Sequence, residues 1–438
     1  MLLTVRDLAF RYHNADHPVL RGLNLDLNTG ECIAITGPNG SGKSTLISIL
    51  AGIIPSFVDG ELTGAITFHR APVKPAVALQ NPDTQILCDS VEKELLFFLT
   101  HSGSCPADAW PREIAAWVGI DDLLARKVYQ LSYGEKQRLI AACALLCGDG
   151  KLILLDEPSA HLDDDGVTRL LNLLDRKKAE GVSIVLIGHE CSRFRDLIDR
   201  WYLLNDGRLI ESQERRSHCL PPIAKPGCAM PVSRPFISIR DIAYRNDLGE
   251  MIFAGFNGDI HKGRVYGLTG PNGSGKSSLA RLVSGVERIE EGDIILDGIK
   301  ASAGTLRKHV KMVGQNPFHQ LLYKTVGANL KSTCKRIDKK PMVSPEEGIR
   351  MLNLESLLSR DVATLSFGEA QRVALLWAVL QSPELLIIDE SFATLDDAGV
   401  DAFAEMLSVL KEKGKSILLI SQIEQSIAGI SDYIFSMT

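Results

Sequence analysis

The chain has 438 residues, which is enough for two or three domains that each bury a core of their own. Hydrophobic residues make up 45% and charged residues 23% of it, without low-complexity segments, which is typical of globular and not of disordered proteins. A formal net charge of -6 provides no basic face for phosphate backbones, so no nucleic-acid partner is expected.

The sequence indicates neither a membrane span nor a secretory leader. Apolar runs such as 182–187 are far shorter than the roughly 20 residues of a transmembrane helix. Charge follows directly after the first five residues, before an apolar signal core could form, so a cytoplasmic location is expected. The nine cysteines contain no C-x-x-C pair, and Cys219 and Cys228 with His218 lack the ligand pairs of a zinc site.

A phosphate-binding loop is predicted near the N-terminus. The apolar run 32–36 predicts a buried strand, and the glycine-rich segment after it leads into a helical pattern. Backbone N–H groups of such a loop converge on phosphates at a helix N-terminus, Lys43 reaches the β- and γ-phosphates, and Ser44 ligates magnesium. The predicted ATP-binding residues are Gly37, Pro38, Asn39, Gly40, Ser41, Gly42, Lys43, Ser44 and Thr45.

Three further landmarks follow in chain order. Gln80 opens the segment Q-N-P-D-T-Q, and the segment L-S-Y-G-E at 131–135 precedes a predicted helix. The buried strand predicted at 151–155 is followed by Asp156 and Glu157, which places two carboxylates at the C-terminal edge of a parallel sheet. We expect Asp156 to hold magnesium and Glu157 to polarise the attacking water as general base.

All of these landmarks recur in the second half of the chain at a nearly constant offset. Gln315 opens a second Q-N-P-x-x-Q segment, L-S-F-G-E stands at 365–369, and Asp389 and Glu390 follow another apolar run. A chance match of two phosphate loops in register is excluded. The second predicted ATP-binding loop consists of Gly270, Pro271, Asn272, Gly273, Ser274, Gly275, Lys276, Ser277 and Ser278.

The two copies predict two domains, at 1–212 and 236–438, joined by a linker at 213–235. Five prolines between 221 and 235 and the lack of apolar periodicity indicate that this linker has no regular structure.

The ordered set of phosphate loop, Gln loop, L-S-x-G-E signature and Asp-Glu strand resembles the ATP-binding-cassette (ABC) ATPase family. The resemblance implies an α/β fold of two tandem P-loop NTPase (RecA-like) domains, each with a helical insertion, at about 88–130 and 321–364. It also implies that the two domains meet head to tail as an intramolecular pseudodimer. The signature of one domain would then close over the ATP that is held with Mg²⁺ by the loop of the other.

The resemblance assigns roles to residues of both halves. Tyr12 is expected to stack on the adenine, whereas the aligned residue of the second half is Asn246, and Tyr244 is expected to pack in the core. The catalytic residues would be Glu157, His189, Glu390 and Gln422. The magnesium ligands would be Ser44, Gln80, Asp156, Ser277, Gln315 and Asp389. The signature residues would be Ser132, Gly134, Glu135, Ser366, Gly368 and Glu369.

The two sites differ at the position where the family places a histidine that contacts the γ-phosphate. His189 fills it in the first half and Gln422 in the second. Glutamine can hydrogen-bond a phosphate but cannot shuttle protons, and such a contribution is worth roughly 10²–10⁴-fold in rate. We expect site two, which holds Lys276, to bind ATP but hydrolyse it slowly. The alternative is that Gln422 substitutes adequately because Glu390 is retained.

The repeated Q-N-P-x-x-Q, with Gln85 and Gln320 as its last residues, resembles the energy-coupling-factor (ECF) branch that serves vitamin and metal-ion importers. That resemblance implies membrane transporter subunits and a substrate-capture subunit as partners, with the chain peripheral at the cytoplasmic face of the membrane. The main rival is the family's translation-factor branch, which acts on the ribosome but joins its domains by a long, charged helical linker. DNA-repair or chromosome ATPases would need zinc-ligand pairs or a coiled-coil insertion, and neither is present.

Overall fold

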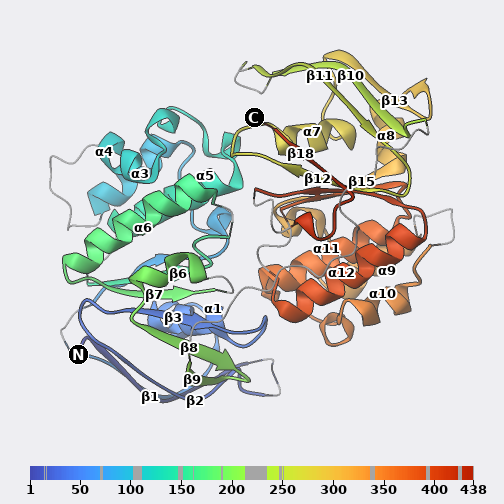
Figure 1. The fold of residues 1–438 in the computed structure, drawn as a ribbon. Coiled ribbons are helices and arrows are strands. Elements are labelled where there is room, and N and C mark those ends of the chain that lie inside the picture. The colour runs from blue at the N-terminus through green and yellow to red at the C-terminus, as the bar shows by residue number, and fades with distance from the viewer. Residues whose placement is uncertain are drawn as a thin grey trace. The chain divides into compact units, whose positions relative to one another are not determined.

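A computed structural model gives the fold (Figure 1). It describes residues 1–13, 15, 17–69, 73–101, 111–146, 151–160, 162–188, 191–212, 234–245, 249, 251–335, 341–390, 395–422 and 427–437. The chain divides into two compact units, Met1–Ser217 and His218–Thr438. The point of division lies inside the predicted linker, most of which, with His218, Cys219 and Cys228, lies outside the described residues.

The first unit is built on two sheets. An antiparallel sheet has the strand order β2-β1-β4, and a second sheet has the order β5-β6-β7-β3-β8-β9, parallel except for the β8–β9 pair. The strands are β1 Leu3–Tyr12, β2 Leu20–Leu27, β3 Cys32–Thr36, β4 Gly60–Phe68, β5 Ala76–Ala78, β6 Leu152–Asp156, β7 Ser183–Ile187, β8 Arg200–Asn205 and β9 Arg208–Ser212.

The helices of the first unit include the one that follows the phosphate loop and those of the insertion. The range 88–130 holds only helical and 3₁₀ elements in its described part, which confirms the predicted helical insertion. The α-helices are α1 Lys43–Leu50, α2 Ile53–Ser56, α3 Val91–His101, α4 Pro111–Val118, α5 Tyr133–Leu146 and α6 Asp164–Ala179. The 3₁₀ helices are η1 Pro82–Thr84, η2 Asp121–Leu123, η3 Val128–Gln130 and η4 Ser192–Leu197.

The second unit repeats this plan with one antiparallel sheet, β11-β10-β13-β14, and one parallel sheet, β15-β16-β17-β12-β18. Its strands are β10 Ile237–Arg245, β11 Met251–Ile260, β12 Val265–Thr269, β13 Glu291–Leu296, β14 Ile299–Lys300, β15 Val310–Val313, β16 Leu385–Asp389, β17 Ser416–Ile420 and β18 Tyr433–Ser436. Its helices are α7 Lys276–Val283, α8 Ala303–His309, η5 Pro317–Gln320, α9 Val326–Lys335, α10 Pro345–Met351, η6 Glu355–Leu357, η7 Val362–Thr364, α11 Phe367–Leu380 and α12 Asp397–Glu412.

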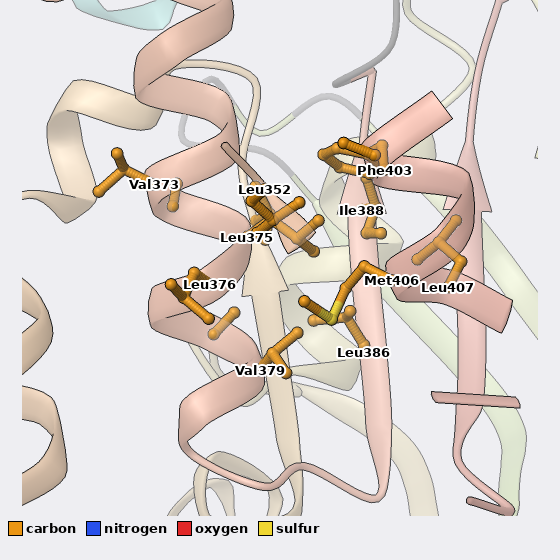
Figure 2. Close-up of a cluster of buried hydrophobic side chains, with 14 of the residues drawn as sticks. Leu352, Val373, Leu375, Leu376, Val379, Leu386, Ile388, Phe403, Met406 and Leu407 are labelled. Carbon is orange, nitrogen blue, oxygen red and sulfur yellow. The ribbon is translucent and has the colours of Figure 1, made fainter. Parts of the chain in front are cut away.

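The core of the second unit fixes the end of strand β16. Leu375 and Val379 of helix α11 and Met406 of helix α12 lie around Leu386 and Ile388 of the strand (Figure 2). All five residues of β16 are buried, as expected for a parallel strand covered on both faces. The strand therefore delivers the residues at its C-terminal end to a defined position.

The structure confirms the predicted α/β fold. The strands expected at 32–36 and 183–187 are β3 and β7, and the apolar run before Asp156 is β6, which includes the aspartate as its last residue. Among the described residues no helix combines the length and the apolar character that a membrane span requires.

Candidate nucleotide sites

The first phosphate loop lies between β3 and α1 and depends on glycine at two points. A Cβ at Gly37 would stand 2.1 Å from the Leu204 carbonyl oxygen, so no larger residue fits there. Gly42 caps helix α1 with φ of 101°, a left-handed conformation that glycine adopts without strain. Lys43 is buried, and its Nζ donates to the Gly37 carbonyl at 2.7 Å and to the Pro38 carbonyl at 3.0 Å. The Lys43 ammonium thus connects the start of helix α1 to the first residues of the phosphate loop.

Two of the proposed magnesium ligands of the first unit, Ser44 and Asp156, lie next to each other. Ser44 Oγ donates to Asp156 Oδ2 at 2.8 Å, which joins the start of α1 to the end of β6. Burial raises the pKa of Asp156, and the hydrogen bond from Ser44 and the charge of Lys43 oppose that shift. A divalent cation would supply the missing positive charge, and a hydroxyl with a carboxylate is a ligand set that suits Mg²⁺.

Glu157 occupies a strained backbone position. Its φ is 52°, in the left-handed region that non-glycine residues rarely adopt, and its N–H donates to the Ile187 carbonyl at 2.8 Å. The carboxylate is buried and lies against Gly188, where an added Cβ would stand 2.8 Å from Glu157 Oε2. The absence of a side chain at residue 188 therefore makes room for the proposed general base.

The second unit repeats the phosphate loop. Lys276 Nζ donates to the carbonyl oxygens of Gly270 at 2.7 Å and Pro271 at 2.8 Å. Gln315 Nε2 stands 3.4 Å from Ser277 Oγ, so the Gln loop reaches the predicted magnesium-binding serine.

Each phosphate loop contains a buried serine hydroxyl at the same position. Ser41 Oγ and Ser274 Oγ, at corresponding positions, are buried and have no hydrogen-bond partner among the described residues. Buried hydroxyls without a partner are rare in folded proteins, and a phosphate oxygen would satisfy both. The residues present in each loop thus fit ATP with Mg²⁺.

The acidic pair of the second unit is buried as in the first. Burial, followed by the charge of Glu390, raises the pKa of Asp389 to about 7, and a hydrogen bond with Ser277 opposes that shift. Glu390 has a φ of 51°, which matches Glu157, and its N–H donates to the Ile420 carbonyl at 3.0 Å. The two strained glutamates are thus equivalent in backbone geometry.

Their surroundings differ. Gln422 Nε2 donates to Glu390 Oε1 at 2.8 Å, so the residue at the predicted histidine position contacts the proposed general base directly. Ser421 stands at the position of Gly188, where the first unit has no room for a Cβ. This second difference was missed by sequence reasoning, although the aligned dipeptides Gly188-His189 and Ser421-Gln422 contained it. His189 itself lies outside the described residues.

The signature residues form helix caps. The Ser132 N–H donates to Glu135 Oε2 at 2.6 Å, and the Glu135 N–H donates to Ser132 Oγ at 3.3 Å, which is a capping box at the start of α5. Ser366 and Glu369 repeat it at the start of α11. Gly134 and Gly368 are the second residues of these helices, both buried. The glutamate of each signature therefore shapes the helix end that carries the serine.

Tyr12 is tied to the phosphate-loop helix. Its hydroxyl lies 2.9 Å from Thr45 Oγ1, and its ring lies edge-on to Phe10 with centroids 4.8 Å apart. Stacking on adenine stays a prediction. Tyr244 packs beside Phe253 against the core of the second unit, as expected, and Asn246 lies outside the described residues.

Comparison with known proteins agrees with this geometry. The sequence model of the ABC transporter family matches residues 20–160 and 253–393. A Methanosarcina acetivorans protein, whose name assigns it to the ABC transporter ATP-binding proteins, is 28% identical over 454 residues, covering 96% of this chain and 85% of the relative.

Two solved structures share the fold over 98% of this chain. One is an archaeal ribosome recycling factor in complex with a ribosomal stalk protein, with a TM-score of 0.62, 22% identity and 87% of that chain covered. The other is a model of ribosome-bound archaeal Pelota and ABCE1, with a TM-score of 0.68, 20% identity and 76% of that chain covered. At these identities the likeness concerns the fold alone. With two matched segments and two complete phosphate loops, the chain belongs to the ABC transporter family and carries two tandem ABC ATPase domains.

Proposed function

We propose that the chain is the ATP-hydrolysing energy-coupling subunit of a membrane transporter, an ECF-type importer of a vitamin or a metal ion, bound at the cytoplasmic face of the membrane. The observation that supports this role is an exposed leucine, held on an ordered loop at the same position of both units. Leu87 and Leu322 each follow the last glutamine of Q-N-P-x-x-Q by two residues, and their relative exposures are 67% and 80%.

The turn before each leucine is held by the motif itself. Asn81 Oδ1 accepts the Asp83 N–H at 3.1 Å, and Gln85 folds back to the end of strand β5, where its Oε1 accepts the N–H of Leu79, the residue after the strand, at 2.7 Å. Gln320 Nε2 likewise donates to the Met312 carbonyl at 2.7 Å. Gln85 and Gln320 thus stabilise the loop itself, and the residues that the loop presents to a partner are the exposed leucines after them.

In each unit a buried polar residue of the insertion holds the backbone at or directly after the leucine. In the first unit, the carboxylate of Glu94 accepts hydrogen bonds from the N–H groups of Leu87 and Cys88. In the second unit, Asn329 Oδ1 accepts the Tyr323 N–H at 3.0 Å. Two different side chains thus restrain the loop at corresponding positions. This supports the view that the loop conformation is needed for function.

A single exposed leucine is ordinary on a protein surface. Recurrence in both units on a loop restrained at both ends supports a docking role, because an apolar side chain presented on a rigid loop loses little entropy on binding. Helices of membrane subunits are the partners that this proposal assigns to the two loops.

ATP hydrolysis would supply the movement. In the proposed head-to-tail arrangement, site one combines Lys43, Asp156 and Glu157 with the signature at Ser366, and site two combines Lys276 and Glu390 with Ser132. Bound Mg²⁺ would neutralise phosphate charge, while Glu157 accepts a proton from the attacking water. Site two would turn over more slowly because Gln422, which contacts Glu390 directly, cannot shuttle a proton.

Purification of the tagged chain from detergent extracts tests the transport role. We expect integral membrane subunits to copurify, and their identity would give the substrate. Recovery of ribosomes without a membrane subunit would instead establish the translation-factor role and overturn this proposal.

A pair of variants locates the docking loops. Leu87→Asp with Leu322→Asp should abolish copurification of the membrane subunits. The matched control, Ile210→Asp with Ile299→Asp, changes apolar residues with exposures of 58% and 75% on β9 and β14, and should retain the subunits. Equal retention by both double variants would contradict docking at the leucines.

A further inference from the structure

The Gln-loop turn and the signature helix of the first unit are joined by polar contacts. The buried Tyr133 donates its hydroxyl to the Gln80 carbonyl at 3.0 Å. One turn further along α5, Lys136 Nζ stands 2.7 Å from Asp83 Oδ1, with side-chain exposures of 15% and 27%. The backbone of a predicted magnesium ligand is thereby tied to the helix that starts at Ser132.

The corresponding segments of the second unit are joined by an aromatic contact in place of the tyrosine hydroxyl and the ion pair. Phe318 of η5 and Phe367 of α11 lie with ring centroids 6.0 Å apart at 70°, an edge-on pair. Ala370, at the position of Lys136, is buried. The Gln315 carbonyl accepts instead from Gln371 Nε2 at 3.2 Å.

Three positions therefore change together between the two copies. Tyr133, Lys136 and Asp83 of the first unit correspond to Phe367, Ala370 and Phe318 of the second. The Q-N-P-x-x-Q and L-S-x-G-E motifs themselves are retained. These replacements retain a contact between the Gln-loop turn and the signature helix but change the kind of interaction that makes it. Salt weakens an ion pair, although it screens a partly buried pair such as Lys136–Asp83 less than an exposed one, and it does not screen an aromatic contact.

We propose that Tyr133, Lys136 and Asp83 are positioning residues that form a polar latch, through which the Gln loop sets the position of the signature helix in the first unit. The second unit uses an apolar latch, Phe318 and Phe367, which does not respond to ionic strength. The consequence for ATP rests on the composite sites of the proposed function. Gln80 serves site one and Ser132 closes site two, so the polar latch links occupancy of site one to closure of site two.

The latch itself is tested by hydrogen exchange of the backbone amides at the start of α5 and α11 in the full chain. Raising the salt from about 0.05 M to about 0.5 M shortens the Debye length several-fold. We expect exchange at 133–137 to accelerate about 2- to 5-fold and exchange at 367–371 to stay unchanged. Exchanging the joints with Asp83→Phe, Tyr133→Phe and Lys136→Ala should abolish the salt response of α5.

The reciprocal variant, Phe318→Asp with Phe367→Tyr and Ala370→Lys, should confer a salt response on α11. Tyr133→Phe alone is nearly isosteric and introduces the residue that the second unit already uses, so misfolding does not obscure its result. A wild-type α5 that exchanges independently of salt, or a Tyr133→Phe variant with wild-type exchange, would overturn the latch.

Photolabelling with azido-ATP, followed by peptide mapping of the two phosphate loops, tests the link between sites. Tyr133→Phe should raise the concentration for half-maximal labelling of the Lys276 loop about fivefold, as for one lost hydrogen bond. An unchanged Lys276 loop together with faster exchange of α5 would overturn the link. The transport role is tested by copurification of membrane subunits, whereas the latch is tested by hydrogen exchange and photolabelling. Failure of one proposal can therefore be distinguished from failure of the other.

Discussion

The side-chain amide of Gln422 donates a hydrogen bond to the carboxylate of Glu390, with 2.8 Å between Nε2 and Oε1. This contact engages an oxygen of the carboxylate that, in the proposed function, would orient the attacking water. Glutamine cannot move a proton through this contact, unlike an imidazole. The second site therefore combines a complete phosphate loop with a glutamate, the proposed general base, that is held by a hydrogen bond.

Variants at the histidine position should reveal unequal sites. We expect His189→Ala to lower ATP turnover by roughly 10²-fold, because it removes a group that contributes to the faster site. Gln422→Ala should change total turnover by less than about threefold, because site two contributes little of it. Steady-state phosphate release by the purified chain measures both. Equal losses would contradict the asymmetry.

A methyl group at residue 188 should impair the first site. Gly188→Ala places a Cβ 2.8 Å from Glu157 Oε2, so the carboxylate must move. A displacement of about 1 Å at a catalytic group can cost about 10²-fold in rate, and we expect a fall of that order in kcat with little change in KM. Ser421→Gly is the matched variant of the second unit, and it should leave turnover unchanged or raise it. Wild-type kcat in Gly188→Ala would contradict this account of Glu157.

Removing the Asp389 carboxyl should change how stability depends on pH. Its pKa is about 7 in the folded chain, above the ordinary value of 3.8, chiefly because of burial. The folded state holds this proton more tightly than the unfolded state, so its stabilising contribution is complete below the ordinary pKa and is lost as the pH rises to about 7. Without nucleotide or Mg²⁺, Asp389→Asn should therefore lose less stability than the wild type between about pH 5 and about pH 8.

We expect that difference to be on the order of 2 kcal/mol, because one pKa unit corresponds to about 1.4 kcal/mol. Denaturant unfolding in the presence of a chelator measures it. Asp401→Asn, which changes an exposed carboxylate of α12, is the control and should follow the wild type. Parallel pH curves for Asp389→Asn and the wild type would show that the pKa of the carboxyl is not raised.

The two signature glutamates should differ in their contributions to stability. Glu135→Ala removes the capping-box partner of Ser132, which typically costs about 1 kcal/mol. Glu369→Ala removes the same cap and also a partner of Arg360, whose Nη1 lies 3.2 Å from Glu369 Oε1. Because Glu369 is buried, its loss should cost about 2–4 kcal/mol. Chemical unfolding compares the two, and equal costs would contradict a structural role for the Arg360 pair.

The sequence by itself determined the two copies, the phosphate loops and the strands that lead into them. Lys43 and Ser44 follow a buried strand, and Asp156 and Glu157 end another, so covalent spacing and hydrophobic pattern were sufficient. The resemblance that these motifs carry placed the helical insertion before each signature. These features depend on neighbours along the chain, which a sequence displays directly.

Only the tertiary structure decided which side chains meet. The roles of Gln85 as a brace for its own turn, of Glu135 as a cap and of Gly188 as space for Glu157 depend on atoms that touch across turns and strands. The polar and apolar latches depend on contacts about 50 residues apart in the chain, between Asp83 and Lys136 and between Phe318 and Phe367. Such contacts are fixed by packing of the whole domain, because the energy of each pair is set by burial and geometry that the local sequence does not contain.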